Sequence, residues 1–249
     1  MEPTLSTQPV ETNEHGQPVG PRVDPWQPKP LPDGRVLEGT WCRLESLDTD
    51  RHAEQLFAAD RADETGESWT YLPYGPFPGL TAYRAWVTDV AGRPDPFFYA
   101  IIDTDPASPS QGQALGVASY LRINPEHGSI EVGNLHYAPA LQRRRAATQA
   151  QYLLMAHAFD DLGYRRYEWK CDSLNAPSRV AATRLGFTYE GTFVQHRVVR
   201  GRNRDTAWYA ITDRRWPLVR SALQAWLAPA NFDGEGRQAA PLRMPSRPG

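Results

Sequence analysis

Two hydrophobic rhythms alternate along the middle of this chain, and each predicts its own kind of element. Ala147, Ala150, Leu154 and Ala158 recur at steps of three and four, which builds the apolar face of a helix. The short apolar run 97–102 follows a proline and is typical of a buried strand. The predicted elements are strand 36–47, helices 51–60 and 80–90, strand 97–102, strands 113–123 and 129–137, helix 147–161, strand 166–171, a helix ending at 185, strands 187–198 and 205–211, and a last helix from 217.

This order of elements predicts an α/β (α+β) fold, with a mixed sheet flanked by helices. Residues 1–33 form a leader rich in proline, which disfavours helix and ladder pairing, and we expect it to be partly disordered. We expect a disordered tail over 229–249, because that segment has no apolar periodicity. One domain, 34–228, remains between them, and its length is typical of a single soluble domain.

Composition excludes several classes of protein. The formal net charge of −2 offers no general attraction to nucleic acid or to an anionic membrane. Cys42 and Cys171 lie far apart and outside any metal-ligand spacing, so we expect free thiols and no metal site. The opening residues are polar, and no apolar stretch approaches the length of a membrane span, so the sequence predicts a cytoplasmic protein without a signal peptide.

The strongest chemical signal is a strand that runs through a short loop into a helix. Residues 130–134 end the strand, and the loop 142–148 contains three consecutive arginines where the helix begins. The first turn of a helix presents unpaired N–H groups and the positive end of the helix dipole. Together with the arginines, these groups favour an anion such as a pyrophosphate.

That loop resembles the acetyl-coenzyme A (acetyl-CoA) signature of the GNAT superfamily, Q/R-x-x-G-x-G/A, with Gln142 first and Ala147 last. The chain is more closely similar to the ribosomal-protein-alanine N-acetyltransferase branch. The matching motifs are Ala147-Thr148-Gln149-Ala150, then Asn175-Ala176-Pro177-Ser178, Leu185-Gly186-Phe187, Glu190-Gly191, and Gly201-Arg202-Asn203-Arg204-Asp205 followed by Tyr209. The resemblance covers roughly residues 36–217.

The resemblance implies a GNAT fold whose central, mostly antiparallel sheet is splayed between its fourth and fifth strands. It implies acetyl-CoA as cosubstrate, with the pyrophosphate at the helix start and the pantetheine arm between strands 130–137 and 166–171. The cofactor-binding residues would be Leu135, Tyr137, Gln142, Arg143, Arg144, Arg145, Ala146, Ala147, Thr148 and Asn175.

One position departs from the family pattern. Arg145 stands where the signature has its first glycine, which lets the backbone approach the pyrophosphate closely. The arginine side chain either reaches the phosphates with its guanidinium or blocks them. This residue is the main argument for a degenerate relative that binds coenzyme A without turnover.

The resemblance also suggests catalytic residues. Glu131, eleven residues before Gln142, matches the glutamate that serves as general base in several members, and His196 is the second choice. Ser178 matches the proposed donor to the departing thiolate in the ribosomal-protein branch. Many members use a tyrosine for that purpose, but the corresponding residue here is Ala182.

The sequence therefore predicts an acetyl-CoA-dependent N-acetyltransferase that acts on a primary amine, a peptide N-terminus or a small molecule, by direct transfer in a ternary complex. The alternative is a catalytically degenerate coenzyme A-binding or regulatory module. The expected partners are acetyl-CoA and the amine acceptor, without nucleic acid or membrane, and a homodimer is possible.

Overall fold

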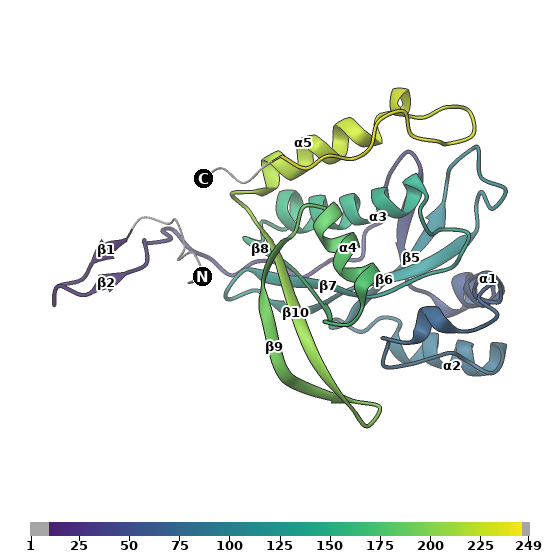
Figure 1. Ribbon diagram of the computed structural model, residues 1–249, viewed down its shortest axis with the longest axis horizontal. Coiled ribbons are helices and arrows are strands. Elements are labelled where there is room, and N and C mark those ends of the chain that lie inside the picture. The colour runs from purple at the N-terminus through teal and green to yellow at the C-terminus, as the bar shows by residue number, and fades with distance from the viewer. Residues whose placement is uncertain (1–9, 246–249) are drawn as a thin grey trace.

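The computed structural model describes residues 10–245, which form an eight-stranded sheet with helices on both faces (Figure 1). The strands stand in the order β3-β4-β5-β6-β7-β8-β10-β9, and every neighbouring pair is antiparallel except β7 and β8. The strands are β3 (Leu37–Glu38), β4 (Cys42–Ser46), β5 (Phe97–Asp103), β6 (Ala114–Asn124), β7 (Ser129–Tyr137), β8 (Arg166–Asp172), β9 (Thr188–Val199) and β10 (Arg202–Thr212).

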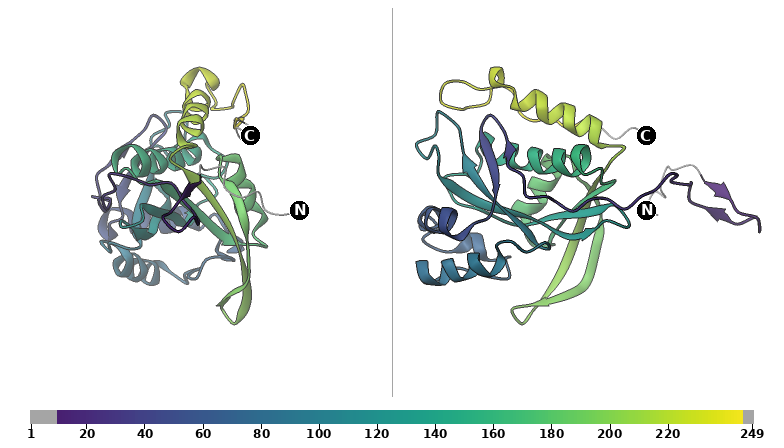
Figure 2. Two further views of the ribbon diagram at one scale, coloured as in Figure 1. Left: turned by 90° about the vertical axis from the view of Figure 1, so that its left-hand side faces the viewer. Right: turned by 180° about the vertical axis from the view of Figure 1, so that it is seen from behind.

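Strand alternation divides the core into two layers. In β5, Tyr99 and Ile101 pack on one face, while Phe98, Ala100 and Ile102 pack on the other, as the two-residue period of a strand requires. Figures 1 and 2 show α3 and α5 over one face and α1 and α2 over the other. The helices are α1 (Thr49–Asp60), α2 (Leu80–Val90), α3 (Arg145–Ala156), α4 (Ala176–Arg184) and α5 (Trp216–Leu227), with short turns at Glu67–Trp69, His157–Asp161 and Pro229–Asn231.

The two parallel strands separate part-way along their length. Pairing between β7 and β8 runs from Ser129 opposite Arg166 to Val132 opposite Trp169 and then stops, although both strands continue. Beyond that point Asn134 has φ 52°, and the register of β7 on β6 shifts, which bends β7 away from its parallel neighbour. The predicted splay between the fourth and fifth strands, counted from β4, is therefore confirmed.

The N-terminal segment reaches well beyond the domain. A small hairpin of β1 (Glu11–Thr12) and β2 (Pro18–Val19) projects from the body on an extended arm (Figures 1 and 2). The arm then returns to the domain, where the Trp26 indole N–H donates to the carbonyl of Glu126 at 2.8 Å. The first nine residues of the predicted leader lie outside the described residues.

The C-terminal segment differs from its expectation. Residues 229–245, for which the sequence predicts a disordered tail, fold back on the domain. Phe232 lies with its ring centroid 5.8 Å from that of Trp41 and 5.1 Å from that of Trp226. A single aromatic anchor produces no periodicity, so the pattern along the sequence gives no sign of this contact. Residues 246–249 lie outside the described part of the chain.

Candidate active site

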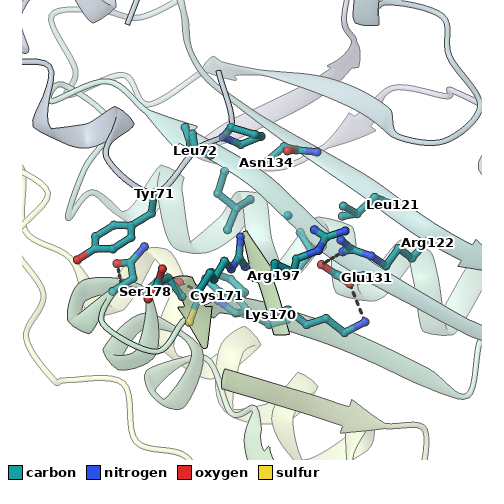
Figure 3. A pocket seen from close by; sticks show the side chains of 18 of the residues that line it. Tyr71, Leu72, Leu121, Arg122, Glu131, Asn134, Lys170, Cys171, Ser178 and Arg197 are labelled. Carbon is teal, nitrogen blue, oxygen red and sulfur yellow. Dashed lines mark hydrogen bonds and ion pairs between the residues drawn. The ribbon is translucent and has the colours of Figure 1, made fainter. Parts of the chain in front are cut away.

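A cavity of about 170 Å³ lies where β7 and β8 separate. The segment between α1 and α2 closes it on one side, and residues of β9, β10 and the start of α4 complete its wall. Figure 3 shows Ser178 and Tyr71 toward one end of this cavity and Glu131 with Arg122 toward the other, with Arg197 between them. Two of the three predicted catalytic residues thus border the same space.

The loop before α3 exposes two of its arginines, and no side chain caps the first turn of the helix that follows. Arg143 has φ 60°, and Arg144 is the N-cap residue of α3 but makes no capping hydrogen bond with its side chain. Both side chains are exposed, and the Gln142 amide donates to the carbonyl of Tyr137 at 2.8 Å. An uncapped helix start flanked by exposed cations fits a pyrophosphate.

Arg145 does not behave like its two neighbours. Its side chain is buried, and its guanidinium donates to both carboxylate oxygens of Asp105 at 2.6 Å. The same group lies over the Trp41 ring, 3.6 Å from its centroid, and 5.0 Å from the centroid of the Phe232 ring. The guanidinium is therefore occupied elsewhere and neither reaches toward a phosphate nor stands across the helix start. What Arg145 can offer a cofactor is its backbone N–H.

The remaining predicted cofactor-binding residues differ in their positions and in their hydrogen bonds. Ala146 and Ala147 keep the first turn of α3 small, and the Thr148 hydroxyl accepts from Arg184 at 3.1 Å, which ties α3 to α4. Leu135 lines the cavity directly. The Tyr137 hydroxyl accepts from Gln151 on α3 at 2.6 Å, so its ring is held by the protein.

Ser178 is held at the mouth of the splay by two neighbours. The Asn175 side chain accepts from the Ser178 backbone N–H at 3.1 Å and caps α4, as predicted. The Trp169 indole N–H donates to the Ser178 hydroxyl oxygen at 2.9 Å. Because the indole N–H donates to this oxygen, the hydroxyl acts as a donor in turn, and in this structure its proton is directed at Cys171. Ala182 is fully buried and offers no proton donor.

Cys171 also lines the cavity, close to Ser178. Burial raises the pKa of this thiol, and the hydrogen bond from the Ser178 hydroxyl offsets the rise only partly. A thiol that stays protonated is a poor nucleophile.

Glu131 is buried between two cations. Its carboxylate oxygens lie 2.6 Å from Arg122 Nη1 and 2.8 Å from Lys170 Nζ. Lys170 also contacts Glu168 at 2.7 Å and lies over the Trp208 ring. Each oxygen of Glu131 is therefore engaged, and one of the two cations has to move before this carboxylate can accept a proton from an amine or a water.

His196 stands on the exposed strand β9 and lines a second hollow of about 100 Å³. This hollow adjoins the cavity through four shared residues, Arg122, Lys170, Arg197 and Arg204. Burial lowers the pKa of His196, and the positive charges of these four residues lower it further. His196 is therefore neutral at pH 7 and able to accept a proton, with its Nδ1 2.9 Å from the hydroxyl oxygen of Thr206.

A chain of polar groups that the sequence analysis does not single out reaches the cavity wall at Ser68. The Ser68 hydroxyl lies 2.9 Å from His136 Nε2 and donates to the carboxylate of Asp63. His136 Nδ1 lies 3.4 Å from Asp60. Burial raises the pKa of Asp60 to about 7 and lowers that of His136 to about 4. These four residues belong to no motif, and the sequence signals only that a histidine stands near the end of a predicted strand.

Two further hydrogen bonds help to hold the segment between α1 and α2 over the cavity. The Tyr71 hydroxyl donates to the carbonyl of Leu174 at 3.2 Å, and Arg200, at the tip of the β9–β10 hairpin, donates to the carbonyl of Gly75 at 2.7 Å.

Within residues 10–245 no cluster of three or more candidate ligands could hold a metal ion. No helix in the same range is long and apolar enough to cross a membrane.

A family model described as "Acetyltransferase (GNAT) domain" matches residues 43–188, well over half of the chain. The chain belongs to the GNAT acetyltransferase family. The match runs from β4 to the first residue of β9 and includes the splayed strands, α3 and α4.

Two solved structures and one curated protein are similar to this chain. A GCN5-related N-acetyltransferase from Brucella melitensis is 43% identical, with a TM-score of 0.84 over 88% of this chain and 97% of that chain. The uncharacterized N-acetyltransferase p20 of Bacillus licheniformis is 22% identical over 70% of this chain and 99% of its own length. The ribosomal α-N-protein acetyltransferase RimL is 22% identical, with a TM-score of 0.59 over 72% of this chain and 94% of that chain, and shares the fold.

Proposed function

We propose that this GNAT protein transfers an acetyl group from acetyl-CoA to a primary amine by direct transfer between two bound substrates. The observation that carries the proposal is the geometry of the splay, which opens between the uncapped start of α3 and the Ser178 hydroxyl. A thioester that lies along the open end of β7 would reach from one to the other. The amine would then enter from the cavity on the far side.

The residues around α3 fit the cosubstrate. Arg143 and Arg144 are exposed beside the free N–H groups of the first turn, where a pyrophosphate gains from both charge and dipole. The open edge of β7, from Gly133 onward, has backbone groups that no longer pair with β8 and that suit the amides of a pantetheine arm. In this proposal Leu135, Tyr137 and Asn175 flank that arm.

The chemistry requires one proton acceptor and one proton donor. The amine nitrogen attacks the thioester carbonyl, a C–N bond forms and the C–S bond breaks, and the amine loses a proton to a base. Ser178 donates a hydrogen bond to the departing thiolate. The base is Glu131, once Arg122 or Lys170 moves aside, or His196, which is neutral and faces the same region. The protonated thiol of Cys171 supports direct transfer over an acetyl-cysteine intermediate.

The buried ion pair of Arg145 bears on the alternative of a coenzyme A-binding module without turnover. That alternative rests on the loss of the signature glycine and on Ala182. Since the Arg145 guanidinium is bound to Asp105, the loss of the glycine costs the site less than the sequence alone suggests.

The test is an acetylation screen of peptides, polyamines and amino acids, read by mass spectrometry, with thiol release measured in parallel. We expect at least one amine to gain an acetyl group with release of one thiol per amide formed. Cys171→Ala should retain this activity. Binding of acetyl-CoA without thiol release across the whole screen would instead support the non-catalytic module.

A further inference from the structure

Two arginines face each other across the hairpin that closes the cavity. Arg197 on β9 is the direct partner of Arg204 on β10, and both line the cavity and the adjoining hollow. Like charges directly opposite each other in a sheet destabilise the pairing. A like-charged pair at this wall is therefore better explained by the binding of a ligand than by the stability of the hairpin.

No carboxylate among residues 10–245 forms an ion pair with either arginine. The nearest compensation is the charge of Asp172, which also lines the cavity and offsets part of the lowering that burial causes in the pKa of Arg204. Among residues 10–245, Glu131 is within ion-pair distance of Arg122 and Lys170, whereas no acidic side chain lies within 4.0 Å of Arg197 or Arg204. Arg204 Nε is also buried, and within that range it has no hydrogen-bond partner. The guanidinium groups of Arg197 and Arg204 therefore have N–H donors without an acceptor among the described residues at the wall shared by the cavity and the adjoining hollow.

The arginine pair is separate from the proposed pyrophosphate site. None of the residues 142–148 lines the cavity or the adjoining hollow. The cations at the start of α3 and those of the hairpin therefore lie at different sites. The lowered pKa of His196 records the same excess of positive charge, to which Arg197, Arg204, Arg122 and Lys170 all contribute beside burial. On the walls of the cavity the cations Arg122, Lys170, Arg197 and Arg204 thus outnumber the carboxylates Glu131 and Asp172.

We propose that the acceptor is an amine that carries a carboxylate near the reacting nitrogen, and that Arg197 and Arg204 bind this carboxylate. The inference rests on the proposed acetyl transfer and names its substrate class. Guanidinium groups bind carboxylates through paired, charge-assisted hydrogen bonds, which gives orientation as well as affinity. The bound carboxylate fixes the amine at the distance from the thioester that the cavity allows.

The experiment compares acceptors that differ only in one charge. One arm uses the C-terminally amidated dipeptides Ala-Asp and Ala-Asn, and the other uses γ-aminobutyrate and its amide. We expect kcat/KM to be about 10- to 100-fold higher for the acid of a pair, the range that a hydrogen bond to a charged group gives. A preference confined to the dipeptides identifies an acidic peptide N-terminus, and one confined to γ-aminobutyrate identifies a small amino acid.

Arg204→Gln should bring the ratio of acid to amide close to one. Arg202→Gln is the matched control, since Arg202 is an exposed arginine of the same hairpin that lines neither hollow. It should keep the ratio of the wild type. Melting temperatures of both variants show that each remains folded.

The outcomes separate this inference from the proposed function. Equal kcat/KM for acid and amide in both arms, or a preference that survives Arg204→Gln, overturns the carboxylate site while acetyl transfer stands. If no amine is acetylated, the proposed function fails. Calorimetry of the amidated dipeptides with the coenzyme A-saturated protein then still measures the preference, and equal affinities overturn the inference.

Discussion

The start of α3 and the β9–β10 hairpin both contain arginines beside the active site, but they hold their charge in different ways. Arg143 and Arg144 extend into solvent at a helix N-terminus, while the next residue, Arg145, is buried against Asp105. Arg197 and Arg204 face each other, and neither forms an ion pair with a carboxylate of residues 10–245. The role of an arginine therefore depends on which group, if any, pairs with its guanidinium. Arginines that are adjacent in sequence can be structural in one case and available to a ligand in the other.

The largest expected effect concerns the base on the acceptor side. Glu131→Gln keeps the shape of the side chain and removes its charge, so kcat should fall by about 10²–10⁴-fold while acetyl-CoA affinity holds. Raising the pH should restore part of the rate, because more of the amine is then already neutral. A pH–rate profile with any amine that turns over measures both effects.

The alternative assignment, with His196 as the general base, predicts the opposite effects of the two substitutions. If His196 is the base, His196→Ala is severe and Glu131→Gln is mild. If neither change slows the reaction by about tenfold, catalysis depends mainly on the positioning of two bound substrates, and both assignments are wrong. Thermal melting of each variant controls for the loss of the Glu131 ion pairs, which stabilise the wall.

The second effect separates the three consecutive arginines. Arg145→Ala leaves Asp105 buried without its partner and should cost about 3–5 kcal/mol of unfolding free energy. The double change of Arg143 and Arg144 to Ala alters only exposed side chains and should stay within about 0.5 kcal/mol. Urea unfolding of the two variants checks the difference, and equal losses of stability would contradict the buried role of Arg145.

The third effect is a pH dependence that the wild type conceals. The raised pKa of Asp60, from 3.8 to about 7, makes stability fall as pH rises through that window, because the folded state holds the extra proton. The lowered pKa of His136, from 6.5 to about 4, makes stability fall as pH drops from 6.5 to 4, because the unfolded state takes up the proton. The two slopes oppose each other between about pH 4 and 6.5.

Single variants should reveal each slope. Asp60→Asn leaves the histidine alone, so stability should rise with pH over this range. His136→Gln leaves the carboxyl alone, so stability should fall with pH. Each slope should approach at most about 1.4 kcal/mol per pH unit. Chemical unfolding at several pH values measures them, and parallel curves for the two variants would refute the opposing pKa shifts of Asp60 and His136.

The same contrast explains how much the sequence could predict. The start of α3 and the cap at Asn175 depend on contiguous motifs and local periodicity, and the splay follows from the family resemblance; the structure has all three where they are expected. The burial of the Arg145 side chain depends on its ion pair with Asp105, forty residues away in sequence, and on its contact with Trp41. The pair of Arg197 and Arg204 depends on hairpin register, and Ser68 meets His136 only through the tertiary fold. Contacts of this kind carry no signature along one chain.

The division of the site into a cofactor side and an acceptor side is tested most directly by calorimetric titration of acetyl-CoA into three forms of the protein. Changing both Arg143 and Arg144 to Ala should weaken binding by about tenfold or more, with less dependence on salt than in the wild type. Changing both Arg197 and Arg204 to Gln should leave the affinity within about twofold. Unchanged affinity in the first variant, or an equal loss in the second, would contradict the assignment of the two arginine clusters to different substrates.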